Sequence, residues 1–183
     1  MTEVPADRPN LSRVVALLQR AGSFEEPNEE IIGLSILGHG LQCAAHLRAE
    51  HPDDYELQVA GLLHDVGHIL RPGCEDVHGL VGAEFVGPVF GERVAALVEY
   101  HVPAKRYLVT VDQSYRAQLS EGSVRTLAMQ GAQMTEEEVV LFRSTSFFAD
   151  AVELRRMDEA AKDPTASVPG LDSWLSTLEL VAG

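Results

Sequence analysis

The chain has 183 residues, a formal net charge of −14, 45% hydrophobic residues and 23% charged residues. This length normally makes one domain with a substantial core, and the composition excludes a disordered chain. The negative charge excludes a nucleic-acid backbone as partner, because polyanion binding needs a basic surface. A small anion can still bind in a local pocket that holds cations or metals.

No stretch approaches the roughly 20 apolar residues of a membrane span, and the N-terminal MTEVPADRPN lacks the features of a signal peptide. We therefore expect a cytoplasmic protein with no membrane partner. The two cysteines, Cys43 and Cys74, form no CxxC motif. They are expected to be free thiols and not part of a thiolate metal site.

Helical periodicity dominates the chain, beginning with an apolar stripe from Leu11 to Leu18 that Gly22 ends. The next helix is expected at 29–50, before Pro52. A helix at 55–70 carries a continuous apolar run, which predicts a buried central helix. Later helices are expected at 78–90, 92–101, 122–130, 135–142, 146–162 and 171–181. No alternating strand pattern stands out, so the sequence predicts an all-α fold.

Five of the seven histidines lie in sequence contexts that can converge: His39, His64, His68, His78 and His101. His46 and His51 are expected to be ordinary surface or core residues. The motif LLHDVGH is expected on one helix, where positions i and i+4 share a face and i+1 is displaced by about 100°. His64, Asp65 and His68 then face one cavity.

A carboxylate has two oxygens that can bridge two cations, so Asp65 is the natural bridge of a dinuclear metal site. A set of histidines and carboxylates without thiolate suits iron, manganese or zinc, and the residue types do not choose among them. Two metals about 3.5–4 Å apart can clamp an oxyanion or activate a bound water.

A second group of residues carries cationic and hydroxyl side chains. Lys105 lies four residues after His101, and Arg155 lies three before Asp158. One helical face is expected to present Ser123, Thr126 and Gln130. These donors point to an anionic ligand. Ordinary capping by the hydroxyls and a simple salt bridge of Arg155 are the open alternatives.

The motif LLHDVGH, with His39 upstream, resembles the HD-domain superfamily of helical metal-dependent phosphohydrolases and, in one branch, diiron oxygenases. Three later segments are similar to those of the PhnZ-type oxygenases, which cleave the carbon–phosphorus bond of small hydroxylated phosphonates. They are HVPAKRYL (101–108), LSEGSVRTLAMQG (119–131) and DAVELRRMDEAAKDP (150–164). The resemblance implies a single HD domain over 1–183, with a core at roughly 29–164 and peripheral helices at both ends.

The resemblance also implies roles for individual residues. A first iron would be held by His39, His64, Asp65 and Asp158. Asp65 would bridge to a second iron, held also by His78 and His101. The pair would be mixed-valent, Fe(II)/Fe(III), with O2 as co-substrate. The phosphonate pocket would be lined by His68, Lys105, Ser123, Thr126, Arg155 and Gln130. The catalytic residues would be Asp65, His68 and Lys105. Asp158 and Lys162 match the Asp-x-x-x-Lys pattern of the related inositol oxygenases.

One feature of the family's phosphonate-cleaving members is missing. They carry a Tyr-x-x-Glu pair shortly before the first histidine, used to gate the iron and sense a substrate amine. Counting back from His39 gives Glu29 and Ile32, and a small gap gives Phe24 and Glu26. The tyrosine is absent in both alignments. This departure argues against an amine-bearing substrate and leaves the proposed metal ligands untouched.

Three functions follow from these patterns. The sequence favours a diiron oxygenase acting on a small hydroxylated phosphonate or a similar anion. The alternative is a metal-dependent phosphohydrolase acting on a nucleotide or phosphomonoester with manganese, magnesium or zinc. The third is a metal-binding sensor domain without turnover. The oligomeric state stays open.

Overall fold

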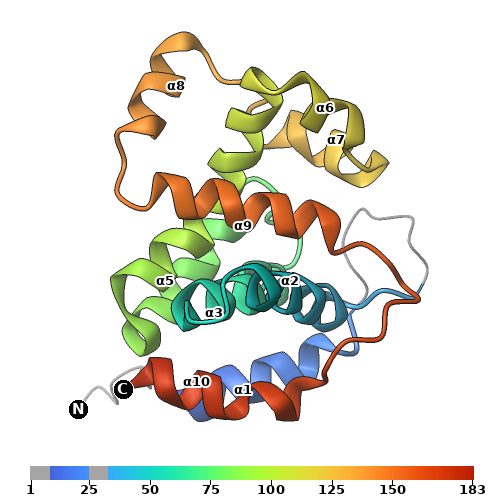
Figure 1. Cartoon of the computed structure of the whole chain (residues 1–183), viewed down its shortest axis with the longest axis vertical. Helices are drawn as coiled ribbons and strands as arrows, with labels where there is room; N and C mark the ends of the chain where they lie inside the picture. Colours follow the sequence, from blue (N-terminus) through green and yellow to red (C-terminus); the bar gives the residue numbers. More distant parts are fainter. Residues whose placement is uncertain (1–8, 25–32) are drawn as a thin grey trace, which may run out of the picture.

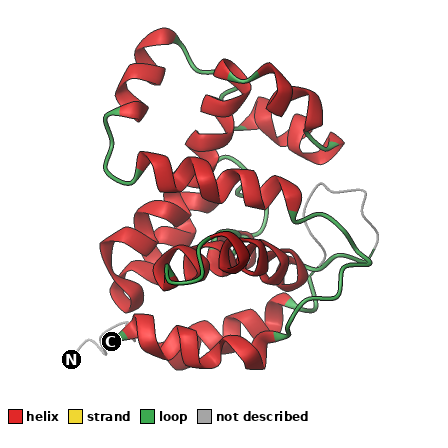
Figure 2. Cartoon of the chain, in the orientation of Figure 1, coloured by secondary structure: helices red, strands yellow, loops and turns green. Residues whose placement is uncertain are grey.

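The computed structural model describes residues 9–24 and 33–183, and the elements within these ranges are all helical (Figure 2). This confirms the predicted all-α fold. In chain order the elements are α1 (Leu11–Ala21), α2 (Ile36–Glu50), α3 (Tyr55–Leu63), α4 (Gly67–Leu70), α5 (His78–Val111), α6 (Gln113–Gln118), α7 (Glu121–Met129), α8 (Glu136–Arg143), α9 (Phe148–Ala160), the 3-10 helix η1 (Leu171–Trp174) and α10 (Leu175–Ala182). None of the described helices is long and apolar enough to cross a bilayer.

The helices are stacked along the long axis of the molecule (Figure 1). At one end α1 lies beside α10, and α2 and α3 lie side by side in the middle with α9 across them. At the other end are α6, α7 and α8. The residues of α3 are buried from Leu57 to Leu63. The prediction of a buried central helix is thus confirmed, and it lies where α2, α5 and α9 meet.

The contact between α2 and α3 depends on a glycine. A Cβ atom at Gly40 would lie 2.6 Å from the carbonyl oxygen of Leu62, closer than any side chain can approach. Without a side chain at this position, the two helix backbones pack directly against each other. The neighbouring residue, His39, is thereby brought to the end of α3 where the chain continues into His64.

The prediction of one helix over 55–70 is wrong at its centre, because α3 ends at Leu63 and α4 begins at Gly67. The intervening turn is tighter than an α-helix. Its amide donors reach three residues back, from Val66 to Leu63 (3.1 Å) and from His68 to Asp65 (3.1 Å). A Cβ atom at Gly67 would lie only 2.0 Å from the carbonyl oxygen of His78. The turn therefore lies against the first residue of α5, a tertiary contact that apolar periodicity does not encode.

The two helices expected at 78–90 and 92–101 form one long, kinked element. The kink is at Gly91, whose φ of 86° is the left-handed conformation that glycine adopts at little cost. Beyond it the helix continues through Pro103 to Val111. This extension places Lys105 on the same helix as His101, as the spacing of four residues requires.

The other boundaries differ in smaller ways. The helix expected at 29–50 is wrong at its start, because residues 33–35 are not helical. Ser35 caps α2 by accepting a hydrogen bond from the amide of Gly38 (3.0 Å), and residues 29–32 lie outside the described residues. Helix α6, capped by Asp112, was not predicted. Helix α9 begins at Phe148 and not at 146. The expected helix at 171–181 opens with the 3-10 turn η1, and Trp174 and Leu178 are fully buried while Val181 is partly buried.

We expect Gly67→Ala to destabilise the protein, because the added methyl group collides with backbone and not with a flexible side chain. The expected loss is about 3 kcal/mol, equivalent to a Tm lower by roughly 10 °C for a chain of this length. Thermal unfolding followed by circular dichroism measures it. Gly170→Ala is the matched control, because a Cβ atom there has no heavy atom within 4 Å. Equal Tm values for both variants would contradict the close-approach argument.

Candidate metal centre and anion pocket

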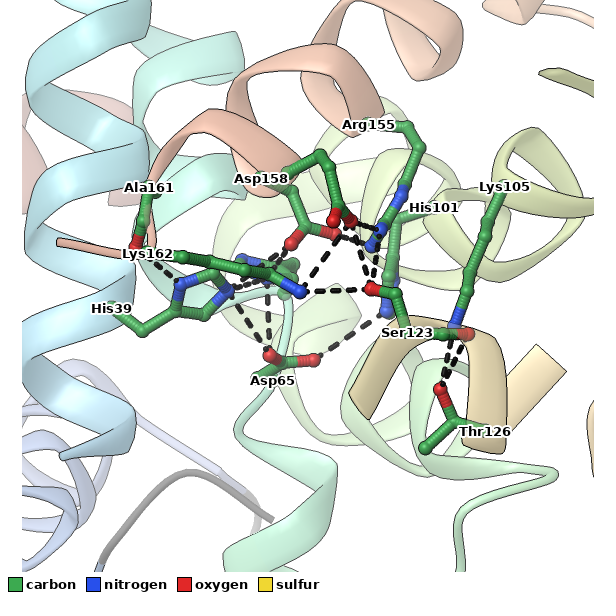
Figure 3. Close-up of polar contacts among 12 residues, drawn as sticks. His39, Asp65, His101, Lys105, Ser123, Thr126, Arg155, Asp158, Ala161 and Lys162 are labelled. Atoms are coloured by element: carbon green, nitrogen blue, oxygen red, sulfur yellow. Dashed lines mark hydrogen bonds and ion pairs between the residues drawn. The ribbon is translucent and has the colours of Figure 1, made fainter. Parts of the chain in front are cut away.

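Asp65 lies in the turn between α3 and α4 with its carboxylate between two groups of imidazole nitrogens. Figure 3 shows one of its oxygens directed toward His39 and the other toward His101. The side chain is 10% exposed. The two oxygens therefore face different partners, which is the geometry that a bridging carboxylate requires.

The first cluster surrounds the Oδ2 atom of Asp65. The Nε2 atom of His64 is 3.1 Å from this oxygen, and the Nε2 atom of His39 is 3.5 Å from it. The two Nε2 atoms are 3.1 Å apart. Asp158, on α9, places Oδ1 at 3.1 Å from His39 and 3.7 Å from His64. All four side chains are buried.

The second cluster surrounds the Oδ1 atom of Asp65. His78, at the start of α5, places Nε2 at 3.3 Å from this oxygen, and His101 places Nε2 at 3.5 Å. The two Nε2 atoms are 2.8 Å apart. Two donors about 2.1 Å from one metal are separated by about 3.0 Å when they are adjacent corners of an octahedron. The spacings in both clusters are close to this value.

The outer nitrogen of each histidine fixes which atom faces the cluster. In all four rings Nδ1 lies within hydrogen-bond distance of a backbone carbonyl oxygen, which can only accept. The partners of His39, His64, His78 and His101 are Ala161 (2.9 Å), Gly61 (2.8 Å), Glu75 (3.0 Å) and Val98 (2.6 Å). Each Nδ1 therefore donates, and Nε2 is the atom that faces the cluster. Nε2 atoms 2.8 Å and 3.1 Å apart need a proton or a metal ion between them, so the residues fit a cation there.

The charges of the cluster favour the same conclusion. Burial lowers the pKa of His101 to about 4, so this imidazole is neutral near pH 7 and able to bind a metal. Burial alone would raise the pKa of Asp65, but the charge of His64 and a hydrogen bond with His101 hold it well below its usual range. Burial would lower the pKa of His64, whereas Asp65 and Asp158 raise it well above the ordinary value. Positive charge is therefore stabilised between the two carboxylates.

His68 lies at the edge of the second cluster. Its ring stacks on His78 with centroids 4.0 Å apart, and its Nε2 is 3.9 Å from Oδ1 of Asp65, farther than His78 or His101. Burial lowers the pKa of His68 to about 3. Its Nδ1 atom has no hydrogen-bond partner in the described part of the chain, and Glu75 Oε2 lies 3.7 Å away.

A cavity of about 40 Å³ opens beside both clusters. Five of the six candidate ligands line it, all except the fully buried His64. The other lining residues are His68, Glu75, Val102, Lys105, Ser123, Thr126, Gln130, Arg155 and Lys162. Every residue that the sequence assigned to the anion pocket thus lies around one space. His46 is exposed and His51 contacts Glu153, both away from this cavity.

The cations of the cavity wall are joined to its hydroxyl groups. Lys105 donates from Nζ to Thr126 Oγ1 (2.6 Å) and to Gln130 Oε1 (3.0 Å). Burial and the nearby charge of Arg155 lower the pKa of Lys105 to about 7. Lys162 donates to Ser123 Oγ (2.8 Å) (Figure 3). These ammonium groups, beside the two clusters, suit an anion that also contacts the metals.

Sequence reasoning missed three residues of this region. Glu75 and Val102 line the cavity; Glu75 lies outside the quoted motifs, whereas Val102 follows His101 in HVPAKRYL and was not singled out. Glu159 contacts Ser123, Lys162 and Arg155. Its position four residues after Arg155 on α9 was a usable signal. The cysteines are free, as expected, and both are buried.

Residues 34–144 match the model of the HD domain family. The chain belongs to the HD-domain family. It is 38% identical over 189 aligned residues to the hydroxymethylphosphonate dioxygenase of Gimesia maris, covering 98% of this chain and 90% of the relative. It is 33% identical over 157 residues to the [1-hydroxy-2-(trimethylamino)ethyl]phosphonate dioxygenase (glycine-betaine-forming) of Leisingera caerulea, covering 80% of this chain and 79% of the relative. The expected resemblance is confirmed.

If the two clusters each hold a metal ion, we expect Asp65→Asn to lower the content of metal-loaded protein to one ion per chain or fewer, because an amide does not bridge two cations as a carboxylate does. Elemental analysis after gel filtration measures this ratio. Asp53→Asn, at an exposed position, is the control and should keep the content of the original protein. Two firmly bound ions in Asp65→Asn would exclude Asp65 as the bridge.

The lowered pKa of Lys105 predicts that anion binding weakens with rising pH. Below about pH 7 the ammonium is charged and attracts an anion, and above it the charge is lost. Sulfate is a suitable probe because its own charge is constant between about pH 6 and pH 9. Its affinity, measured by calorimetry, should fall across this range. Lys105→Arg stays protonated and should show a smaller fall; parallel curves would show that Lys105 does not titrate there.

Proposed function

We propose that the protein is an iron-dependent oxygenase that cleaves the carbon–phosphorus bond of a small 1-hydroxyphosphonate, consuming O2 and releasing phosphate. The observation that carries the proposal is the position of Asp65 between two imidazole clusters, in a cavity whose wall also carries Lys105 and Arg155. Both phosphonate dioxygenases that the chain resembles support this function over a phosphohydrolase or a sensor domain.

The residues of the chain divide into two tasks in this proposal. His39, His64, Asp65 and Asp158 hold one iron, and Asp65 with His78 and His101 holds the other. When bound, the iron pair supplies the redox chemistry toward O2. The wall of Lys105, Ser123, Thr126, Gln130 and Arg155 binds the phosphonate oxygens and keeps the carbon–phosphorus bond beside the metals. His68, neutral in the cavity, is placed to contact the substrate hydroxyl group.

The smallest substrate of this class, hydroxymethylphosphonate, gives a balanced reaction. One O2 accepts four electrons as the carbon–phosphorus bond breaks. Both oxygen atoms enter the products, which are formate, hydrogen phosphate and one proton. No further reductant is needed, so the proposal requires only the substrate, O2 and the bound iron.

The cavity favours a substrate without a trimethylammonium group. Quaternary ammonium groups are commonly bound by aromatic rings. No Phe, Tyr or Trp is among the described residues that line the cavity. We therefore propose that hydroxymethylphosphonate is used in preference to the bulkier trimethylammonium compound.

The test supplies iron-loaded protein with hydroxymethylphosphonate and measures phosphate release together with O2 consumption. We expect one phosphate per O2 and no release without oxygen. The value of kcat/KM should be at least about tenfold higher than for the trimethylammonium substrate, a difference of about 1.4 kcal/mol. Asp65→Asn should be inactive. Phosphate release that continues at the same rate under anaerobic conditions would exclude an oxygenase.

A further inference from the structure

Arg155 is a buried cation of the cavity wall, and protein groups surround its guanidinium. It is 4% exposed and lies on α9, three residues before Asp158. Its NH1 group donates to Oδ2 of Asp158, the oxygen that does not face His39. Its NH2 group donates to Glu159 and to Ser123 Oγ (3.2 Å). One edge of the guanidinium thus faces the metal centre and the other faces the anion pocket.

The third guanidinium nitrogen of Arg155, Nε, binds a residue that does not line the cavity. Nε donates to the phenol oxygen of Tyr115 at 2.6 Å. Tyr115 lies on α6, is 4% exposed and is not among the cavity-lining residues. Burial raises the pKa of Tyr115 to about 12, so the phenol is neutral and accepts through a lone pair.

The contact of Arg155 with Tyr115 opposes its contacts with Asp158 and Glu159. Asp158 and Glu159 are both carboxylates and both attract the guanidinium toward α9. Tyr115 is the acceptor on the Nε side that opposes this attraction. Without its oxygen, Nε–H is buried without a partner, and the planar guanidinium is free to rotate toward the two carboxylates. That rotation moves NH2 away from Ser123 and from the cavity.

We propose that Tyr115 is a positioning residue for the anion pocket, which holds the guanidinium of Arg155 in the orientation that binds the phosphonate. The proposal rests on the proposed function of the cavity. It assigns a role to α6, which contributes no residue to the cavity wall among those described.

Tyr115→Phe removes only the oxygen atom and keeps the buried ring. In iron-loaded protein kept without oxygen, we expect the Kd for inorganic phosphate to rise about tenfold, consistent with the loss of one hydrogen bond to a charged group. In turnover, KM for hydroxymethylphosphonate should rise by a similar factor while kcat changes less than threefold. Iron content should be unchanged, because Asp158 keeps its contacts with His39 and His64.

Tyr107→Phe is the matched control. Tyr107, on α5, is also buried, but it packs against Phe142 and Phe148 and not against Arg155. Its phosphate affinity should equal that of the original protein. A second measurement follows the Arg155 Nε–H signal by nuclear magnetic resonance. We expect slow exchange with water in the original protein and in Tyr107→Phe, and fast exchange in Tyr115→Phe.

The outcomes separate this proposal from the proposed function. If the original protein turns over the phosphonate and Tyr115→Phe binds phosphate as tightly as Tyr107→Phe, the positioning role is wrong and the oxygenase stands. An equal rise of Kd in both variants also overturns it, because the effect then follows any lost phenol. If the original protein binds neither phosphate nor phosphonate, the anion pocket itself is refuted, and the proposed function fails with it.

Discussion

The carboxylate of Asp65 is buried between imidazole nitrogens that come from separate elements, and a charged group in this position is stable only when positive charge surrounds it. The packing of the helices serves this requirement. Gly40 lets α2 approach α3 so that His39 reaches one oxygen, and Gly67 lets the turn approach α5 so that His78 reaches the other. A side chain at Gly40 would move His39 away from Asp65, and one at Gly67 would move His78 away from it. The same close contacts between helices therefore build the core and position the candidate metal ligands.

The cavity wall combines three cations with three carboxylates, Asp65, Glu75 and Asp158, in a chain that is strongly acidic overall. The whole protein carries −14, yet the cavity wall carries Lys105, Arg155 and Lys162. These cations are buried because each has a local partner: Thr126 for Lys105, Asp158 for Arg155 and Ser123 for Lys162. An acidic chain can therefore still offer a small anion a local group of cations, although carboxylates lie beside them.

The sequence predicted the features that depend on local patterns. The all-α class followed from apolar stripes, and the residues gathered at the cavity followed from motif spacing and family resemblance. The tight turn at Asp65 was not predictable, because it depends on contact with His78 from a later helix. Helix α6 is short, with a single buried residue, Tyr115, and so has no apolar stripe to reveal it. The segment containing Glu26, Glu29 and Ile32 lies outside the described residues, and Phe24 is 39% exposed and does not line the cavity.

Helix α9 lies outside the residues that match the HD domain family. The match spans 34–144, which includes His39, Asp65 and His101 but ends before α9 begins at Phe148. Asp158 is thus contributed from beyond the match, and it supplies the fourth donor atom around the first metal position. The same helix carries Arg155 into the cavity wall, so one element joins the candidate metal centre to the anion pocket. The alignment with the hydroxymethylphosphonate dioxygenase, in contrast, covers 98% of the chain and therefore includes α9. The candidate metal centre and the anion pocket consequently depend on this helix as much as on the His64–Asp65 pair.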